Sequence, residues 1–307
     1  MAKDGARRKK AGVSTEDRIR VLPLWNGSIT IEPLKGGLSN ESYLVRDAGG
    51  RHVVRFGRDF PFHHVARQRE VMTARAAHEA GFAPAVRYSE PGLMVTAYLG
   101  ARTFAASDVR ANRERIARLI RAFHTEMPKH VSGAGFMFWV FHVIRDYART
   151  LLSGGSRMAP SVPAYLELAE QLERQQRPLA IVFGHNDLLP ANLLDDGQRL
   201  WLIDFEYAGF GTGMFDLAGA ASNAGMSEDE SDELLATYFD CRPDFGLRRA
   251  HAAMQCASLL REAMWSMVSE LYLSAPGADY AAYTAENLTR LDAALCSYRA
   301  RFGDLPS

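Results

Sequence analysis

The 307-residue chain lacks the features that mark secreted, membrane-spanning and nucleic-acid-binding proteins. Its 3 cysteines, Cys241, Cys256 and Cys296, are odd in number and lack metal-type spacing, so we interpret them as reduced core thiols of a cytoplasmic protein. No apolar run approaches the roughly 20 residues that a membrane helix needs, so no membrane insertion is expected. The 36 Lys and Arg balance the 36 Asp and Glu, so the overall charge does not favour a nucleic-acid partner.

The N-terminus is basic from Lys3 to Lys10, but no apolar segment follows, so we do not expect a signal peptide. We predict that residues 1–17 form a disordered, solvated tail rather than a nucleic-acid or membrane arm. The length allows one large domain or two lobes, which we assign to residues 18–98 and 99–307. The oligomeric state stays open.

The stretch from Phe183 to Asp216 carries the strongest chemical signal. Asp187 and Asn192 occur as H-x-D-x-x-x-x-N, and Asp204 follows a strand-like run in I-D-F-E. Phosphoryl transfer from ATP needs a carboxylate for the acceptor hydroxyl, and then an amide and a carboxylate for Mg²⁺. The three residues follow the order found in kinases. We therefore predict that Asp187 is catalytic and that Asn192 and Asp204 bind the metal.

A hairpin is predicted inside this stretch. Two short apolar runs, 192–194 and 200–203, flank an Asp-Gly pair, which is a strong hairpin signal. The hairpin would bring Asn192 and Asp204 to the same end, where both could reach one cation. The alternative is an unrelated β-hairpin whose spacing matches by accident.

The segments HNDLLPANLL and LWLIDFEYAGFGTGMFDLA resemble the choline/ethanolamine kinase branch of the aminoglycoside-phosphotransferase-like kinases. The resemblance extends over about residues 29–302 and is most specific over 184–218. Asn186, where aminoglycoside phosphotransferases usually have glycine, and the pair Glu206-Tyr207 favour the choline-kinase branch. The resemblance implies an α+β, two-lobed protein-kinase-like fold. The N-terminal lobe would be a small, mainly antiparallel sheet with one helix, and the C-terminal lobe would be larger and mainly helical.

Glycines mark a turn in the N-terminal lobe. Strands are predicted over residues 29–34, 42–45, 52–56, 86–89 and 93–98, and a helix over 64–80. Gly36 and Gly37 lie between the first two strands, where backbone N–H groups could approach a phosphate, although a plain turn explains the same pattern. The resemblance makes this turn the nucleotide-covering loop, with Asn40 at a recurrent position.

Arg55, on the third strand, occupies the place of the kinase lysine, and a guanidinium offers phosphate a rigid fork of donors. Glu70, in the helix, is predicted to hold Arg55 over the nucleotide. The alternatives are an exposed strand arginine and a solvated helix charge. Backbone groups around Tyr98 and Leu99 are predicted to face the adenine at a hinge, although Tyr98 also suits the core.

Two adjacent histidines, His63 and His64, are interpreted as surface residues and not as metal ligands, because neighbouring helical side chains diverge. Helices are predicted over residues 107–124, 136–152, 164–175, 227–239, 247–272 and 280–302, and another starts near Asp216. Ser107 is a predicted N-cap, and Ser227 with Glu230 forms a capping box.

Two residues are given supporting roles around the catalytic loop. His185 lies two residues before Asp187, and we predict that it orients the loop by hydrogen bonding. By the resemblance, Asp216 is a structural acid that bonds back to the same loop.

The acceptor is decided by side chains near Asp187 that lie outside the phosphate machinery. A quaternary ammonium is held best by aromatic faces with a nearby carboxylate. Glu206 and Tyr207 follow the metal aspartate, and Trp265 in ASLLREAMWSMVSE matches a pocket tryptophan of the choline-kinase motif. Glu262 replaces the other tryptophan of that motif, so the cage is thinner, although Glu262 could restore negative charge. Trp265 also suits a core position.

The chain is thus predicted to use ATP and Mg²⁺ to phosphorylate a small amino alcohol, choline or ethanolamine. Thiamine, homoserine and aminoglycosides are alternative acceptors, although the run 228–230 is only a partial counterpart of an aminoglycoside-binding acidic cleft. No A-P-E segment follows Asp204, which argues against a protein kinase. A nucleotide-binding scaffold without turnover is the alternative of another class.

Overall fold

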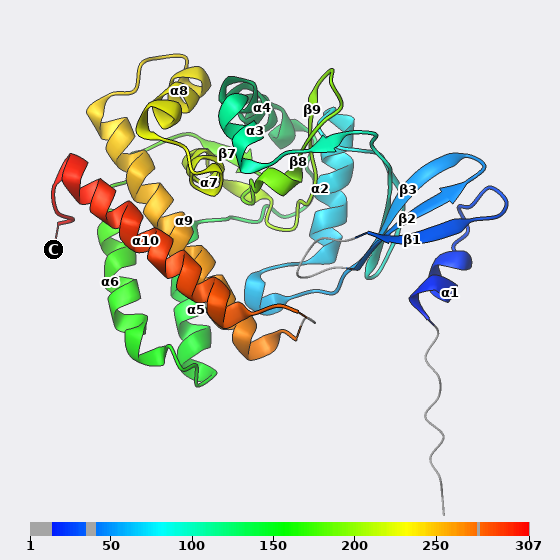
Figure 1. The fold of residues 1–307 in the computed structure, drawn as a ribbon, viewed down its shortest axis with the longest axis horizontal. Helices are drawn as coiled ribbons and strands as arrows, with labels where there is room; N and C mark the ends of the chain where they lie inside the picture. Colours follow the sequence, from blue (N-terminus) through cyan, green and yellow to red (C-terminus); the bar gives the residue numbers. More distant parts are fainter. Residues whose placement is uncertain (1–13, 35–40, 275–276, 307) are drawn as a thin grey trace, which may run out of the picture.

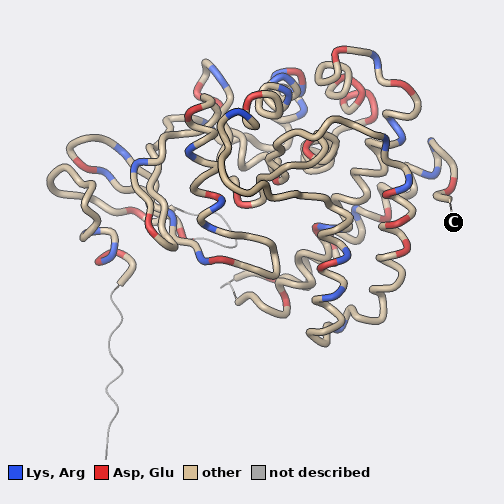
Figure 2. The backbone as a smooth tube through the Cα atoms, turned by 180° about the vertical axis from the view of Figure 1, so that it is seen from behind, with Lys and Arg blue, Asp and Glu red and all other residues tan. Residues whose placement is uncertain are grey.

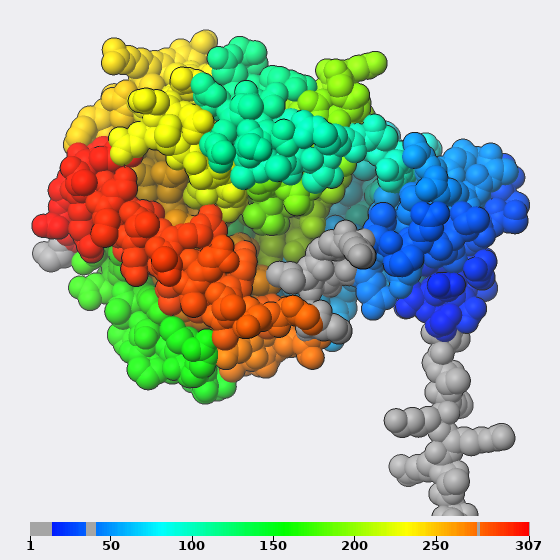
Figure 3. Space-filling model, viewed as in Figure 1, coloured from blue at the N-terminus to red at the C-terminus, as the bar shows by residue number. Residues whose placement is uncertain are grey.

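The structure, a computed structural model, describes residues 14–34, 41–274 and 277–306. A small β-rich lobe projects from the side of a larger helical lobe (Figures 1 and 3). Acidic and basic residues alternate along both lobes, in keeping with the balanced composition (Figure 2). The predicted α+β, two-lobed architecture is confirmed.

The small lobe is built on one antiparallel sheet with the strand order β1-β2-β3-β5-β4. Its strands are β1 (Thr30–Leu34), β2 (Glu41–Asp47), β3 (Gly50–Phe56), β4 (Val86–Glu90) and β5 (Leu93–Ala97). All five predicted strands are confirmed, with small differences at the ends. Helix α2 (Arg67–Glu79) lies between this sheet and the helical lobe, and it starts three residues later than predicted, after the short 3-10 helix η1 (Pro61–His63).

The first helix, α1 (Thr15–Arg20), includes residues that we expected in the disordered tail. Ser14 caps it, because its side chain accepts a hydrogen bond from the Asp17 N–H at 3.1 Å. Ile19 is fully buried against the small-lobe sheet, and its carbonyl accepts from the Trp25 indole N–H at 2.6 Å. The apolar residue and the cap together explain why the helix is ordered before β1.

The hairpin predicted between residues 192 and 203 is confirmed. Strands β8 (Leu193–Asp195) and β9 (Leu200–Leu202) are antiparallel partners, and β6 (Arg102–Thr103) extends the same sheet. Strand β7 (Ile181–Gly184) pairs with β10 (Gly209–Thr212). The chain leaves the first sheet at Ala97 and joins the hairpin sheet at Arg102, so the lobes are connected over residues 98–101.

The helical lobe differs from the prediction in its first two helices. A single helix with Ser107 as N-cap is wrong: a break at Asn112 separates two helices, the N-cap of the first is Ala105, and Ser107 lies inside it. The segment 136–139 is extended, because Phe138 N–H donates to the Phe210 carbonyl at 2.7 Å. The α-helices are α3 (Ala106–Ala111), α4 (Arg113–Glu126), α5 (Val140–Ser153), α6 (Val162–Glu173), α7 (Met214–Ala224), α8 (Glu228–Phe239), α9 (Phe245–Tyr272) and α10 (Tyr280–Phe302), and short 3-10 helices are η2 (Met127–Lys129), η3 (Ala159–Ser161) and η4 (Pro190–Asn192).

Helix α9 is the central support of this lobe, buried along most of its length and packed against α5, α6, α7 and α10. The capping box of α8, with Ser227 and Glu230, is confirmed. The cysteine prediction holds only for Cys256, which is buried in α9; Cys241 and Cys296 are exposed. No helix in the described ranges is both long enough and apolar enough to span a bilayer.

Candidate active site

The loop after β7 is held in place by one buried carboxylate, that of Asp216. The N–H groups of His185 and Asn186 each donate to an oxygen of Asp216 at 2.7 Å, and His124 Nε2 lies 2.8 Å from the same side chain. Burial opposes ionisation, but these partners keep the pKa of Asp216 below its usual value. The structural roles predicted for Asp216 and His185 therefore agree with the hydrogen bonds observed.

The backbone of Asn186 is left-handed, with φ of 62°. Glycine and asparagine tolerate this conformation better than other residues, so either suits the position. The Asn186 side chain also donates to the Tyr207 carbonyl at 3.1 Å, which ties the loop to the segment after β9.

Asp187 and Asn192 meet directly. The Asn192 side-chain NH₂ donates to the Asp187 carbonyl at 2.9 Å and to its carboxylate at 3.3 Å, so the amide oxygen is directed away from Asp187. His185 connects both sides of the hairpin, because Nδ1 accepts from the Asp187 N–H at 3.3 Å and Nε2 donates to the Ile203 carbonyl at 2.9 Å.

Asp204 follows Ile203 in a left-handed conformation, with φ of 67°. The Ile203 N–H donates to the Asn192 carbonyl at 3.1 Å, so Asn192 and Asp204 lie at the same end of the hairpin, as predicted. An amide oxygen and a carboxylate suit Mg²⁺, which takes one or two carboxylates and completes its shell with phosphate oxygens and water.

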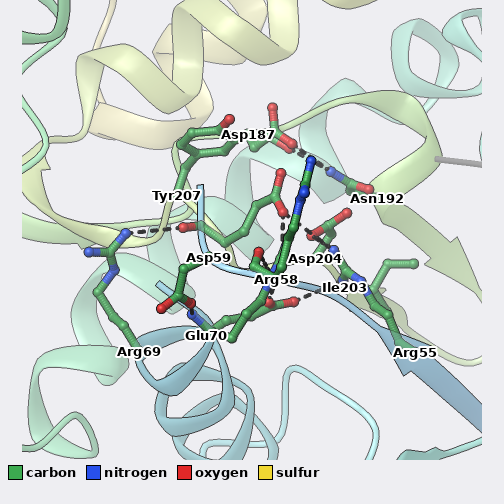
Figure 4. Close-up of polar contacts among 12 residues, drawn as sticks. Arg55, Arg58, Asp59, Arg69, Glu70, Asp187, Asn192, Ile203, Asp204 and Tyr207 are labelled. Carbon is green, nitrogen blue, oxygen red and sulfur yellow. Dashed lines mark hydrogen bonds and ion pairs between the residues drawn. The ribbon is translucent and has the colours of Figure 1, made fainter. Parts of the chain in front are cut away.

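A group of five charged residues, here called the ion cluster, lies between α2 and the hairpin (Figure 4). Arg55 Nη1 lies 2.9 Å from Glu70, as predicted, and Arg55 Nη2 lies 2.7 Å from Asp204 and 3.5 Å from Glu206. Arg67 Nη1 bridges Glu70 at 2.6 Å and Glu206 at 2.9 Å. Each charge has an opposite partner, which offsets the cost of its burial.

The ion cluster includes one residue predicted for another role and one that was not predicted. Glu206, predicted for the acceptor pocket, has its carboxylate buried between Arg55 and Arg67. Arg67 was missed by sequence reasoning, although its position three residues before Glu70 on one helix face was a detectable signal. Burial disfavours the charged form of Arg55, but Asp204, Glu70 and Glu206 together raise the pKa of Arg55 above its usual value.

A second group, here called the aromatic cluster, contains Tyr207, Arg261, Glu262, Trp265 and Tyr283. The Trp265 indole N–H donates to Tyr207 Oη at 2.9 Å, and Tyr283 Oη donates to Glu262 at 2.8 Å. Three predicted acceptor residues, Tyr207, Glu262 and Trp265, are therefore brought together. Arg261 was missed; it donates to Glu262 at 2.8 Å, and its guanidinium lies 4.5 Å from the Tyr207 ring centre.

His63 is part of the wall behind Trp265, so its prediction as a surface residue is wrong. It is buried between Tyr147 Oη at 3.2 Å and Ser269 Oγ at 3.0 Å, with its ring centre 5.1 Å from that of Trp265. Burial, and then the charge of Arg261, lower the pKa of His63 to about 3. His64 is half-buried and bonds to Asp146 at 2.7 Å.

Asp187, the predicted catalytic residue, has an unusual electrostatic environment. Burial raises the pKa of Asp187 well above its usual range; Asp204 and Glu262 raise it further, and Arg261 opposes them. A carboxylate with a raised pKa is a stronger proton acceptor, which is the property required of a general base.

Tyr98 and Leu99 are half-buried in the connection between the lobes. The Tyr98 N–H already donates to the Arg51 carbonyl at 3.0 Å, and the Arg51 guanidinium covers the Tyr98 ring. Gly36, Gly37 and Asn40 lie outside the described residues.

The site thus combines a candidate catalytic carboxylate, two candidate metal ligands and an Arg-Glu pair, located between a β lobe and a helical lobe. This is the arrangement expected of a kinase-like phosphotransferase. Comparison with known proteins agrees: the model of the phosphotransferase enzyme family (APH) matches residues 30–252. The chain belongs to this family.

Two relatives are similar to long parts of this chain. Protein LicA of Haemophilus influenzae is 26% identical over 269 residues, which are 84% of this chain and 77% of that protein. A probable ethanolamine kinase of Arabidopsis thaliana is 25% identical over 207 residues, 61% of this chain and 54% of that protein.

Solved structures share the fold. A choline/ethanolamine kinase family protein of Mesorhizobium loti has a TM-score of 0.74 at 24% identity, covering 93% of this chain and 97% of that one. The choline kinase LicA of Streptococcus pneumoniae has a TM-score of 0.71 at 22% identity, covering 88% and 94%. The fold predicted from the family resemblance is therefore confirmed.

Proposed function

We propose that this protein transfers the γ-phosphoryl group of ATP to the hydroxyl of a small amino alcohol, with choline and ethanolamine as the first acceptors to test. The observation that carries the proposal is the meeting of Asp187, Asn192 and Asp204 at one end of the hairpin. Family membership, and fold neighbours that include a choline kinase and an ethanolamine kinase, support the reaction type. A neighbour called LicA in complex with AMP, with a TM-score of 0.72, supports a nucleotide as the donor.

In the proposed reaction, Asp187 takes the proton of the acceptor hydroxyl while the hydroxyl oxygen bonds to the γ-phosphorus. The bond between that phosphorus and the β–γ bridging oxygen breaks, and ADP leaves with the electron pair. His185, through its bonds to Asp187 and Ile203, keeps the loop and the hairpin in register.

Asn192 and Asp204 would hold Mg²⁺, which when bound neutralises charge on the phosphate oxygens. Arg55 Nη2 contacts Oδ1 of Asp204, so Arg55 lies next to the carboxylate that would hold the metal. Glu70 would keep Arg55 in place for the phosphates. We propose that the reaction takes place in the cytoplasm.

The test is ADP release from Mg-ATP in the presence of choline, ethanolamine, thiamine or an aminoglycoside, with Asp187→Ala as the control. We expect ADP release that depends on at least one acceptor and is lost in the variant. ATP binding without acceptor-dependent ADP release would instead indicate a scaffold without turnover.

A further inference from the structure

His63 is a buried residue whose hydrogen bonds reach two helices of the helical lobe. It ends the short 3-10 helix η1, between β3 and α2, and is only 3% exposed. Its Nδ1 lies 3.2 Å from Tyr147 Oη of α5, and its Nε2 lies 3.0 Å from Ser269 Oγ of α9. A neutral imidazole has one donor and one acceptor nitrogen, and a hydroxyl can serve either. Both nitrogens therefore have suitable partners, which fix the plane of the ring.

The face of this fixed ring supports Trp265. The two ring centres are 5.1 Å apart, and the ring planes are inclined by only 30°. Tyr280 and Tyr283 also contact Trp265, but at 6.2 and 6.3 Å and at steep angles of 69° and 79°. His63 is thus the nearest of these three rings and the one closest to parallel. Aromatic pairs prefer particular relative orientations, so the imidazole constrains the plane of the indole.

Trp265 adjoins the wall of a small recess beside Asp187, here called the acceptor recess. Glu262, which lies three residues before Trp265 in α9, lines this recess together with Asp187. Residues three apart lie on the same face of a helix. Tyr283 connects the two, because its hydroxyl donates to Glu262 at 2.8 Å and its ring contacts Trp265. The orientation of Trp265 therefore affects the wall that an acceptor at Asp187 would meet.

We propose that His63 is a positioning residue for the acceptor. Its imidazole ring, fixed by two hydroxyls, holds the plane of Trp265 and thereby the fit of the acceptor beside Asp187. This inference rests on the proposed phosphotransferase function, and it adds to the acceptor site a residue from the segment between β3 and α2. Without a flat ring at position 63, Trp265 can tilt into the space left behind. Acceptor binding then weakens, whereas nucleotide binding does not change.

Two variants separate the ring of His63 from its hydrogen bonds. His63→Leu and His63→Phe both lose the bonds to Tyr147 and Ser269, but only phenylalanine keeps a flat ring behind Trp265. ADP release is measured with choline and with ethanolamine as acceptors. His63→Leu should raise KM for the acceptor about three- to tenfold, the range expected for the loss of one aromatic pair. His63→Phe should keep this KM within about twofold of the unmodified protein, and both variants should leave KM for ATP unchanged.

His251→Leu is the matched control for the loss of a buried histidine. His251 is also 3% exposed, and it lies on α9 almost four turns before Trp265, about 20 Å along the helix. The control should lower the free energy of unfolding, measured in urea, but leave KM for the acceptor unchanged. Dependence on Trp265 is tested in a Trp265→Leu background. There, His63→Leu should raise KM for the acceptor by less than about 1.5-fold, because the ring that His63 positions is absent.

Three results would overturn the role of His63 and leave the kinase function standing. The first is an equal rise in KM for the acceptor in His63→Leu and His63→Phe. The second is a rise that follows the loss of stability and also occurs in His251→Leu. The third is an effect of His63→Leu that is as large in the Trp265→Leu background as in the unmodified protein. A lack of ADP release from the unmodified protein with every acceptor would instead contradict the phosphotransferase function itself.

Discussion

The ion cluster and the aromatic cluster lie on two sides of Asp187 and treat buried charge differently. In the ion cluster, two arginines pair with three carboxylates, with contacts of 2.6–3.5 Å. In the aromatic cluster, one arginine and one carboxylate pair, but Arg261 retains two nitrogens without partners in the described ranges. Arg67 of the ion cluster also retains one nitrogen, Nη2, without a partner in the described ranges. The two clusters therefore differ mainly in charge balance: three carboxylates share two arginines in the first, whereas one carboxylate pairs with one arginine in the second.

The largest effect is expected at Asp187, which lies between the two clusters. Asp187→Asn keeps the shape and can still accept the Asn192 hydrogen bond, but it cannot take a proton. We expect kcat to fall by about 10²–10⁴-fold with little change in KM for ATP, as is typical for the loss of a general base. Steady-state kinetics of ADP release measure this, and a kcat within a factor of three of the unmodified protein would exclude Asp187 as the base.

The next largest effect is expected on the free energy of unfolding, and it differs between the two clusters. Arg55→Gln leaves three carboxylates with only Arg67 as counterion, so we expect a loss of about 3–5 kcal/mol in the free energy of unfolding. Arg261→Gln leaves one carboxylate that still accepts from Tyr283 and removes two unpartnered donors, so its cost should be smaller.

Urea unfolding of the Arg55→Gln and Arg261→Gln variants measures both losses of stability. Arg46→Gln is the control, because Arg46 forms an exposed pair with Glu32 on the same sheet as Arg55 and should change stability by less than about 1 kcal/mol. Equal costs for Arg55→Gln and Arg261→Gln would mean that the clusters do not differ as described.

A smaller effect is expected on the pH dependence of stability, through His63, which lies behind Trp265 of the aromatic cluster. The pKa of His63 is lowered from 6.5 to about 3, so folding favours the uncharged imidazole. Stability is therefore fully present above the unfolded pKa and falls as the pH decreases from about 6.5 towards 3, by up to about 1.4 kcal/mol per pH unit.

His63→Gln should flatten this dependence between pH 7.5 and 5, measured by urea unfolding. His251, whose pKa burial lowers to about 4, should contribute a similar slope. The stability of the double variant His63→Gln/His251→Gln should therefore depend less on pH than the stability of either single variant. If His63→Gln leaves the slope of unfolding free energy against pH unchanged, other residues cause the loss of stability in acid.

The smallest effect is expected at Trp265. Trp265→Phe keeps most of the ring packing and loses the 2.9 Å bond to Tyr207, a net loss of about 1 kcal/mol. If Trp265 shapes the acceptor recess, KM for the acceptor should rise about fivefold while KM for ATP stays the same. Trp201→Phe is the control, because the Trp201 indole N–H donates to Asp196 at 2.8 Å on the exposed hairpin. Equal rises in both KM values would point to a general loss of folding.

The catalytic hairpin could be predicted because its information is local. The H-x-D-x-x-x-x-N spacing, the Asp-Gly turn and the two short apolar runs lie within about twenty residues, and the turn geometry determines the strand pairing. The same holds for the capping box of α8, which needs only Ser227 and Glu230.

Contacts between distant segments could not be predicted in this way. Glu206 meets Arg67 across 139 positions of sequence, and His63 meets Ser269 across 206. The local sequence around Glu206, two residues after Asp204, is the same whether its side chain is exposed or buried. The same is true of His63, which precedes a helix. The unpredicted ion pairs of Glu206, the error at His63 and the omission of Arg261 have this common origin.

The amino-acid sequence by itself determined the phosphotransferase family, the order of the strands along the chain and the hairpin that carries the candidate site residues Asp187, Asn192 and Asp204. Short-range spacing and turn chemistry encode these features. Only the tertiary structure decided which buried charges become partners. Packing α2, the hairpin and α9 together neutralises Glu206 and leaves part of Arg261 without a partner. That outcome depends on desolvation and three-dimensional distance, and neither is a property of a local segment.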